Sequence, residues 1–324
     1  MINVGIVGYG NLGKGVLKAI QKCSDFNLVG VFTRRKAEDL NLPNGVNGYS
    51  TDIILEFKDK IDVLILCGGS AKDLPETTAK YLENFNTVDS FDTHAKIPEY
   101  LDNLKKVAEK SKKLSAISIG WDPGLFSIAR AIFASVLPDG KDYTFWGKGV
   151  SQGHSDAIRK INGVKNAIQY TVPIQDAIDK VKGGEMPELS SLERHERVCY
   201  VCVEKEEDKD RIEKEIKEMP NYFKGYKTTV NFVSEQEVKA MQQKLSHGGE
   251  VIRTGKTSEE NNQVLEFVLK LDSNPEFTGS VLVSYARAVY RLAKNGEFGV
   301  KTVFDIPLKY LSPKSEDSLI KELL

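Results

Sequence analysis

The chain begins with Met1-Ile-Asn-Val-Gly-Ile-Val-Gly8-Tyr-Gly10-Asn-Leu-Gly13-Lys14, and Leu28-Val-Gly-Val-Phe-Thr-Arg-Arg35 follows after an amphipathic stretch. A short apolar strand thus leads into a Gly-x-Gly-x-x-Gly turn that opens a helix, and a second apolar strand follows. This order of elements is typical of a dinucleotide-binding βαβ unit. In such a turn Gly8 permits the tight bend, Gly10 lets a pyrophosphate approach the backbone, and Gly13 lets the helix pack against the strand. The helix N-terminus supplies N–H donors to the phosphates.

The end of the second strand distinguishes between the two nicotinamide dinucleotides. Proteins that bind NAD usually carry an acidic residue about 20 residues after the glycine-rich turn, where it binds the ribose 2′-hydroxyl. Here the corresponding place holds Thr33, Arg34 and Arg35. Two cations suit a 2′-phosphate, and no acid stands there to repel it, so the sequence favours NADP over NAD. The alternative is that both arginines are ordinary surface residues.

Composition limits the class of protein. A length of 324 residues suggests one large or two ordinary domains, and 40% hydrophobic with 28% charged residues is typical of a globular protein. The formal net charge of −1 provides no basic field for nucleic acid. No apolar run reaches the ~18 residues that a membrane span needs. The first strand begins directly after Met1, which leaves no room for a signal peptide, so we expect a cytoplasmic protein with no membrane partner.

Strands and helices alternate over residues 1–119. This alternation predicts an α/β fold with a doubly wound parallel sheet of the Rossmann type. Continuous apolar runs such as Ile61–Cys67 fit strands that are buried on both faces of such a sheet. The expected strands are 2–7, 27–33, 61–67, 87–89 and 114–119, and the expected helices are 11–23, 75–84 and 98–112.

The pattern changes after Gly120 and predicts a second, α+β domain on a mostly antiparallel or mixed sheet. We expect a buried helix at 124–137, a solvated charged helix at 204–218 and a long helix at 278–294. Strand-like segments lie near 142–150, 165–173, 196–204 and 226–233. The expected division is a dinucleotide-binding domain at 1–120, to which the chain end at 296–324 returns, and a substrate domain at 121–295. A cleft between two domains is the default place for a ligand.

The four cysteines are too few for a disulfide framework. Cys199 and Cys202 have the spacing of a redox or zinc motif, but they lie in a segment that reads as a strand. Residues three apart on a strand point to opposite faces, so we interpret both as packing residues. Zinc-ligand spacings and phosphate-binding Walker motifs are absent from the sequence, which therefore predicts no metal.

Two polar clusters follow expected sheet strands at their carboxyl ends, where doubly wound folds bind ligands. The first is Asp89-Ser-Phe-Asp92-Thr-His94 and the second is Gly120-Trp121-Asp122-Pro-Gly124. Asp92 and Asp122 form a candidate pair of carboxylates, and carboxylates suit a substrate ammonium group. The alternative is that both are turn or cap residues, because these are good turn sequences.

Two further residues carry candidate binding chemistry. Arg197 leads directly into the apolar strand segment Val198–Val203, so its charge needs a partner, and a carboxylate matches its guanidinium in a bidentate pair. That carboxylate belongs either to a ligand or to one of the many glutamates of the chain. His247, in Ser-His-Gly-Gly, either binds a ligand or caps a loop. For His94, His154 and His195 we expect structural roles.

The motifs together resemble one family, the meso-diaminopimelate dehydrogenases. The similarity extends from residue 2 to about 313, and the Ser-Gln-Gly-His-Ser-Asp run is far more specific than the glycine-rich turn. The motifs that carry it are Gly8-Tyr-Gly-Asn-Leu-Gly13, Thr33-Arg-Arg35, Cys67-x-Gly-Ser70, Val88-Asp-x-x-Asp92-x-His94, Gly120-Trp-Asp-Pro-Gly124, Thr144-Phe-Trp-Gly147, Ser151-Gln-Gly-His-Ser-Asp156, His247-Gly-Gly249 and Leu271-Asp-x-Asn-Pro275.

The resemblance implies reversible, NADP-dependent oxidative deamination at the D centre of meso-2,6-diaminopimelate. The products would be L-2-amino-6-oxopimelate, which cyclises to tetrahydrodipicolinate, together with ammonia and NADPH. In reverse the reaction serves lysine and cell-wall biosynthesis. The family is homodimeric, so the resemblance also implies that the second domain takes part in dimerisation.

The resemblance also implies roles for single residues. Asp92 and Asp122 correspond to the groups that hold the D-centre amine, and one of them would handle the reacting proton through a water. Around them would lie the pocket residues Trp121, Trp146, Gln152 and Gly153. The distal L centre would be held by Thr171, Arg197, His247 and Asn274, with Arg197 on its carboxylate. The cofactor side would comprise Gly8, Tyr9, Gly10, Asn11, Leu12, Gly13, Thr33, Arg34, Arg35, Cys67, Gly68 and Ser70.

Two other readings compete with this one. The first is another two-domain NADP-dependent reductase, of the dihydrodipicolinate reductase or homoserine dehydrogenase type, which would need different motifs after residue 120. The second is a regulator that binds NADP(H) without turnover, which would be expected to lack one half of the substrate residues. The Gly120-Trp-Asp-Pro-Gly124 and Ser151-Gln-Gly-His-Ser-Asp156 motifs argue against the other reductases, and the presence of both halves of the substrate residues argues against the regulator.

Overall fold

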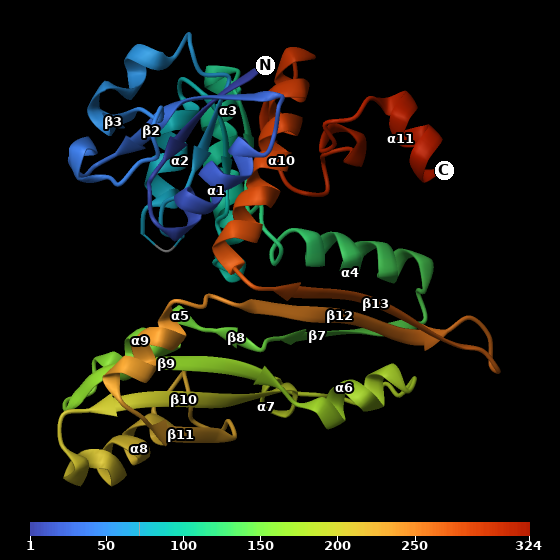
Figure 1. Cartoon of the computed structure of the whole chain (residues 1–324). Coiled ribbons are helices and arrows are strands. Elements are labelled where there is room, and N and C mark those ends of the chain that lie inside the picture. Colours follow the sequence, from blue (N-terminus) through green and yellow to red (C-terminus); the bar gives the residue numbers. More distant parts are fainter. Residues whose placement is uncertain (71) are drawn as a thin grey trace. The chain divides into compact units, whose positions relative to one another are not determined.

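A seven-stranded, wholly parallel sheet organises the N-terminal part of the chain. The structure of the protein is a computed structural model, which describes residues 1–70 and 72–324. The strand order is β14-β6-β5-β4-β1-β2-β3, which contains the order of a Rossmann sheet and confirms the predicted fold class. Figure 1 shows β2 and β3 of this sheet in blue. The strands are β1 (Ile2–Val7), β2 (Phe26–Thr33), β3 (Gly48–Ser50), β4 (Val63–Leu66), β5 (Asn86–Asp89), β6 (Leu114–Ala116) and β14 (Gly299–Lys301).

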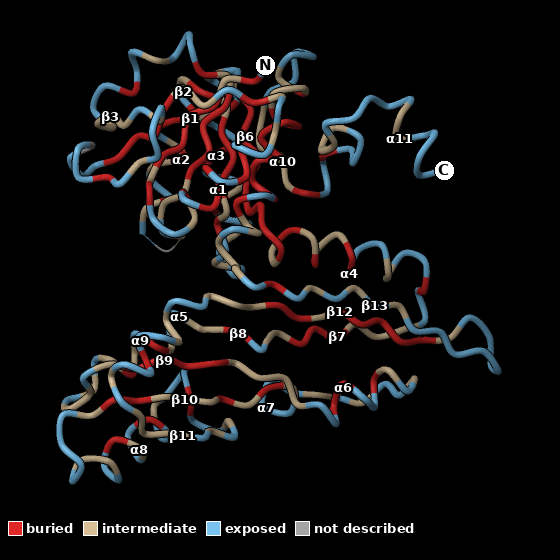
Figure 2. The backbone as a smooth tube through the Cα atoms, viewed as in Figure 1, coloured by how far each residue is buried: buried red, intermediate tan, exposed pale blue. Residues whose placement is uncertain are grey.

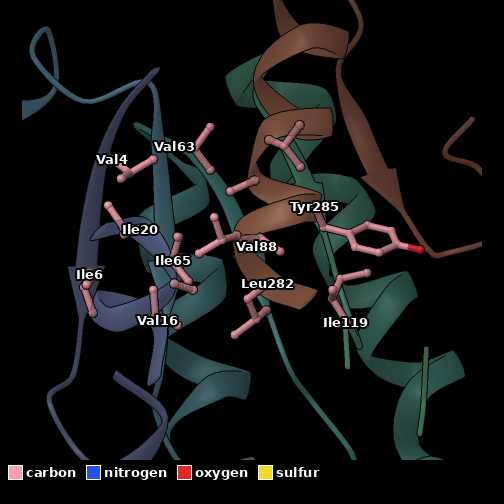
Figure 3. Close-up of a cluster of buried hydrophobic side chains, with 14 of the residues drawn as sticks. Val4, Ile6, Val16, Ile20, Val63, Ile65, Val88, Ile119, Leu282 and Tyr285 are labelled. Carbon is pink, nitrogen blue, oxygen red and sulfur yellow. The ribbon is translucent and has the colours of Figure 1, made fainter. Parts of the chain in front are cut away.

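Helices cover both faces of this sheet. On one face α1 (Asn11–Gln21) and α10 (Asn274–Lys294) bury apolar side chains against β1, β4 and β5, as the sticks in Figure 3 show. On the other face α2 (Leu74–Leu82) and α3 (Ile97–Ser111) pack against the opposite side chains of the same strands. The central strands are therefore buried on both sides, which explains their continuous apolar sequences.

The second part of the chain contains two small sheets. The first has the order β11-β10-β9-β8, in which β10 and β11 are parallel and the other pairs are antiparallel. The second has the order β13-β12-β7 and is antiparallel throughout. The strands are β7 (Gly140–Trp146), β8 (Gly149–Val150), β9 (Val164–Pro173), β10 (His195–Val203), β11 (Thr228–Phe232), β12 (His247–Lys256) and β13 (Asn262–Leu271).

Shorter helical segments complete the fold. The remaining α-helices are α4 (Leu125–Val136), α5 (Gln152–Arg159), α6 (Gln175–Lys182), α7 (Ser191–Arg194), α8 (Lys209–Glu218), α9 (Glu235–Gln242) and α11 (Glu316–Leu323). The 3-10 helices are η1 (Ala37–Asp39), η2 (Thr51–Phe57), η3 (His94–Lys96), η4 (Glu206–Asp208) and η5 (Leu308–Tyr310). The predicted charged helix corresponds to η4 and α8, which contact the core mainly through Ile212 and Ile216.

In this region two sequence predictions were wrong and one hairpin was missed. The segment 142–150 is not one strand, because the chain turns at Gly147 (φ +123°) and β7 and β8 join different sheets. The hairpin of β12 and β13 was missed, although the polar stretch between two apolar runs at 251–252 and 264–271 was a usable signal. The helix α4 was expected to be buried, but part of it is exposed (Figure 2). Ile132 and Val136 on this helix are 49% and 62% exposed.

The cysteines of β10 confirm the interpretation as packing residues. Both are free thiols. Cys199 packs in a cluster with Val201 and Ile212, whereas Cys202 packs with Ile168 and Val238 in a different cluster. They therefore lie on opposite faces of the strand, as the spacing required.

The chain divides into two compact units, residues 1–128 with 275–324 and residues 129–274. The segment after α10 belongs to the first unit, where β14 pairs with β6. The second unit ends at residue 274 and not at the expected 295, because α10 packs on the parallel sheet. The expected functional division at residue 120 stays a prediction. No described helix is both long enough and apolar enough to cross a membrane.

Candidate active site

The glycine-rich turn has the geometry that binds a pyrophosphate. Gly8 has a φ of +94°, in the left-handed region that favours glycine, and Gly10 precedes the first turn of α1. A Cβ on Gly13 would lie 2.1 Å from the carbonyl oxygen of Gly8, so a larger residue would push the helix from the strand. A Cβ on Gly10 would meet no atom within 4 Å, and its backbone is therefore open to a ligand.

A pocket of about 280 Å³ opens beside this turn, at the carboxyl ends of β1 and β4. The order of the sheet reverses between these two strands, and doubly wound folds bind ligands at such a point. The pocket lining contains eight of the predicted cofactor residues: Gly8, Tyr9, Gly10, Thr33, Arg34, Arg35, Cys67 and Gly68. The other four, Asn11, Leu12, Gly13 and Ser70, are not among its lining residues.

The two arginines at the end of β2 are held in different ways. Arg35 donates to the carbonyl oxygen of Tyr9 at 2.8 Å, which ties the end of β2 to the glycine-rich turn. Arg34 is exposed and forms an ion pair of 2.8 Å with Asp73. A hydrogen bond from the Gly69 N–H and the neighbouring Arg34 lower the pKa of Asp73. Asp73 lines the pocket and was missed by the sequence analysis, because it lies far from the glycine-rich turn in the chain.

These residues fit a phosphorylated dinucleotide. The open backbone at Gly10 and the N-terminus of α1 provide the usual pyrophosphate site. Arg34 and Arg35 supply two cations at the pocket wall, against one acid, Asp73. The donor set therefore matches NADP, whose additional phosphate brings further negative charge.

Asp92 lies in the loop that follows β5. Its side chain is exposed, and its backbone N–H donates to the hydroxyl of Ser70 at 2.8 Å. The Ser70 hydroxyl also lies 3.5 Å from the hydroxyl of Thr93. Ser70 thus joins the loop after β4, which lines the cofactor pocket at Gly68, to the loop that carries Asp92.

Asp122 lies in a tight turn after β6, the strand next to β5. Trp121 and Gly124 form a β-bridge, and a Cβ on Gly124 (φ +135°) would lie 1.7 Å from the carbonyl oxygen of Gly120. Trp121 is buried against the edge of Phe126, with ring centroids 5.2 Å apart. The half-buried Asp122 therefore projects from a closely fixed turn. The cofactor pocket and both candidate carboxylates belong to the first unit.

Arg197 forms the centre of a polar cluster in the second unit. It is only 8% exposed, and its guanidinium donates to the hydroxyl of Thr171 at 2.7 Å, directly across the β9–β10 pair. The ring of Tyr226 lies 4.1 Å from the guanidinium carbon. Burial lowers the pKa of Arg197, and Tyr226 opposes this shift. Within the described parts of the chain, no carboxylate pairs with Arg197, so the internal glutamate considered from the sequence is not its partner.

His247 lies beside the same cluster. A Cβ on Gly149 would come within 2.4 Å of the His247 ring, and Gly149 pairs with Thr171 in the β8–β9 register. His247, Gly149, Thr171 and Arg197 thus form a continuous row across β12, β8, β9 and β10. Burial lowers the pKa of His247.

Two histidines that we expected to be structural lie around this row. Burial and the charge of Arg197 lower the pKa values of His154 and His195 to about 4, so both are neutral at pH 7. The neutral Nε2 of His195 accepts the backbone N–H of Trp146 at 2.8 Å, and the two rings stack with centroids 5.4 Å apart. His195 therefore holds Trp146 in place. The signal for this was its position two residues before Arg197, on the same face of β10.

The other predicted pocket residues lie at the ends of helices. Gln152 and Gly153 are the exposed first residues of α5, directly after β8. Asn274 begins α10, and its backbone N–H donates to the carbonyl oxygen of Leu245, two residues before His247. The second unit thus contains Trp146, Gln152, Gly153, Thr171, Arg197, His247 and Asn274.

Comparison with known proteins identifies the family. A family model described as the diaminopimelic acid dehydrogenase C-terminal domain matches residues 120–273. The meso-diaminopimelate D-dehydrogenase of Ureibacillus thermosphaericus is 57% identical over 100% of this chain and 99% of its own length. The chain belongs to the meso-diaminopimelate dehydrogenase family.

Two solved structures of similar proteins carry relevant ligands. A mutant of the family enzyme from Clostridium tetani E88, solved with DAP, is 51% identical over the full length of both chains and has a TM-score of 0.94. An engineered D-amino acid dehydrogenase bound to NADP⁺ is 40% identical over 100% of this chain and 99% of its own, with a TM-score of 0.85. Family membership removes the ground for the alternative reductases considered from the sequence.

Proposed function

We propose that this protein catalyses the reversible, NADP-dependent oxidative deamination of meso-2,6-diaminopimelate at its D centre. Substrate, NADP⁺ and water give L-2-amino-6-oxopimelate, ammonium, NADPH and a proton. The observation that carries the proposal is the distribution of charged groups over the two units. In the first unit, carboxylates follow β5 and β6 at the carboxyl edge of the sheet that also carries the cofactor pocket. In the second unit, a buried cation without a carboxylate partner among the described residues lies on β10.

NADP would be held by the glycine-rich turn, by Arg34 and Arg35, and by the loop from Cys67 to Ser70. When bound, the cofactor accepts the hydride that leaves the D-centre carbon. The chain must therefore bring that carbon to near-attack distance, roughly 3–3.5 Å, from the acceptor. The proximity of the Asp92 loop to the loop after β4, joined through Ser70, supports this arrangement.

Asp92 and Asp122 would bind the ammonium group of the D centre. Trp121, Trp146, Gln152 and Gly153 would form the walls that exclude solvent from it. One of the two carboxylates would take a proton from the substrate ammonium and pass it to solvent. After the hydride has left, the same carboxylate, ionised again, would take a proton from the water that attacks the iminium carbon, and ammonia would then leave. The fixed turn around Asp122 supports a role for that residue in orienting the water.

Arg197 would bind the carboxylate of the L centre, and Thr171, His247 and Asn274 would complete this distal set. The guanidinium is held by the Thr171 hydroxyl and the Tyr226 ring, so its remaining N–H groups are oriented before a ligand binds. Neutral imidazoles at His154 and His195 leave Arg197 as the local cation for that carboxylate.

The proposed function predicts stoichiometric product formation. With meso-diaminopimelate and NADP⁺ at alkaline pH, the purified protein is expected to release one ammonia for each NADPH formed. Enzymatic ammonia determination alongside absorbance at the NADPH band measures both. Tight NADPH binding without ammonia release would instead identify the protein as a regulator that binds the cofactor without turnover.

The cofactor preference should depend on the two arginines of the pocket. Replacing Arg34 and Arg35 together by Ala is expected to raise the KM for NADP⁺ by about 10–100-fold, because two charge-assisted contacts to the 2′-phosphate are lost. The KM for NAD⁺ should rise much less, since NAD⁺ loses only the support that the Arg35 contact with the Tyr9 carbonyl oxygen gives to the glycine-rich turn. Lys36→Ala, which removes the next exposed cation, is the matched control. An equal loss for both cofactors would show that the arginines do not discriminate between them.

Two further proposals concern the oligomeric state and the cellular location of the protein. The exposed apolar side chains of Ile132 and Val136 on α4 support a homodimer, since another chain would cover them. Sedimentation equilibrium of the wild type and of Ile132→Glu tests this, and a monomeric wild type would contradict it.

We also propose that the enzyme works in the cytoplasm, which fractionation of the producing cells would test.

A further inference from the structure

Asp89, the last residue of β5, is a completely buried carboxylate. Its neighbour Val88 points into the core against α1 and α10 (Figure 3), so Asp89 points to the opposite face of the sheet, toward α2 and α3. The deamination described above does not use it, because it lies beneath the loops that carry the candidate catalytic groups.

One carboxylate oxygen of Asp89 fixes both of those loops. Oδ1 accepts the backbone N–H of Phe91 at 3.0 Å, at the start of the loop that carries Asp92. The same atom accepts the backbone N–H of Ser118 at 3.2 Å, in the segment that leads to Asp122. The main-chain oxygen of Asp89 also accepts the N–H of Ile119 at 2.9 Å.

The second carboxylate oxygen anchors Asp89 to the helices. Oδ2 accepts the hydroxyl of Tyr100 on α3 at 2.7 Å and the hydroxyl of Thr78 on α2 at 3.2 Å. The carboxylate therefore has four donors from four segments. Burial raises the pKa of Asp89, and the hydrogen bonds from Tyr100, Phe91, Ser118 and Thr78 oppose that shift.

The backbone that Asp89 holds needs such support. Ser118 has a φ of +57°, a left-handed conformation that residues other than glycine seldom adopt. Its N–H is fixed by Asp89 just before the chain reaches Gly120, Trp121 and Asp122. On the other loop, Phe91 packs against Tyr100 with ring centroids 4.2 Å apart, and Asp92 follows directly.

We propose that Asp89 is a positioning residue, which sets the places of Asp92 and Asp122 relative to each other by holding the first residues of both loops. This inference rests on the proposed function, in which these two carboxylates bind and deprotonate the D-centre ammonium. Because reacting groups must be placed within about 1 Å, a shift of either loop lowers kcat by roughly 10²-fold.

Two substitutions separate geometry from charge. Asp89→Asn removes the charge but keeps an oxygen that accepts both backbone N–H groups, while the hydroxyls of Tyr100 and Thr78 can reverse their direction. Asp89→Glu keeps the charge but adds a methylene to a close-packed site, which displaces the loops. We expect Asn to keep kcat within about 5-fold of the wild type and Glu to lower it by roughly 10²-fold. The Kd for NADPH, measured by fluorescence titration, should stay within about 3-fold in both, because the pocket lining does not include Asp89.

Thr87→Val is the matched control. It removes a buried hydrogen bond of 2.8 Å between Thr87 and Ser115 in the same pair of strands, two residues before Asp89, without touching either loop. It should lower the melting temperature but leave kcat within about 2-fold. A larger loss of kcat in Asp89→Asn than in Asp89→Glu, or a loss in Thr87→Val as large as that in Asp89→Glu, would overturn the inference. A wild-type protein that releases no ammonia would overturn the proposed function itself. If the wild type is active but the kcat values of the variants fall in a different order, only the role of Asp89 is overturned.

Discussion

Arg197→Met is expected to lower kcat/KM for meso-diaminopimelate by about 10²–10³-fold, equivalent to roughly 3–4 kcal/mol. The substitution removes the buried cation that would bind the distal carboxylate, so that carboxylate would be desolvated without a partner. Most of the loss should be in KM, with a smaller fall in kcat, because distal binding also orients the D centre. Steady-state kinetics with varied substrate at saturating NADP⁺ measures both.

Arg194→Met provides the control for Arg197→Met. Arg194 precedes β10, and its guanidinium donates to the carbonyl oxygen of Leu189. The same chemical change three residues away should alter kcat/KM by less than about 3-fold. Equal losses in the two variants would mean that the effect comes from disturbance of the fold, and the distal role of Arg197 would have to be abandoned.

Asp122→Asn is expected to lower kcat by about 10²–10⁴-fold, the range that a positioned general base contributes. The side chain is half-buried in a turn fixed by the Trp121–Gly124 bridge, so the amide should occupy the same place without accepting a proton. The affinity for NADPH should not change, since the cofactor pocket lining does not include Asp122. Single-turnover and steady-state rates at several pH values separate the chemical step from product release.

Asp92→Asn distinguishes the two carboxylates. Asp92 is more exposed than Asp122, so we expect its replacement to raise the substrate KM more than it lowers kcat. Asp102→Asn, on the exposed surface of α3, serves as the control for removal of a carboxylate. If Asp122→Asn weakened only KM while Asp92→Asn abolished turnover, the proton-handling role would belong to Asp92.

The parallel sheet and much of the candidate site could be predicted from the pattern of residues in the sequence. The glycine-rich turn is a local signal, and so are Asp92 and Asp122, because the carboxyl ends of neighbouring parallel strands must meet at one edge of the sheet. Arg197 was recognised because a cation within an apolar strand needs a partner. The roles assigned to these residues rest on the family resemblance and stay proposals.

The rest depends on contacts between segments that are distant in the sequence. The stacking of Tyr226 on Arg197 follows from the parallel pairing of β10 with β11, which no local pattern indicates. The ion pair of Asp73 with Arg34 requires the loop after β4 to meet the end of β2. For α4, apolar periodicity predicted burial, but a pattern cannot distinguish a face covered by its own chain from one left exposed, as Ile132 and Val136 are.

The most direct test of the central claim is to follow which end of the substrate loses its hydrogen. Meso-diaminopimelate carrying deuterium at the Cα of its D centre, or in a second sample at the Cα of its L centre, is oxidised with NADP⁺, and the NADPH is analysed by mass spectrometry. The account predicts deuterated NADPH only from the D-labelled sample, because the distal set with Arg197 holds the L centre away from the reacting position. Deuterium transferred from the L-labelled sample, or from both samples, would contradict the assignment of the two sets of residues to the two ends of the substrate.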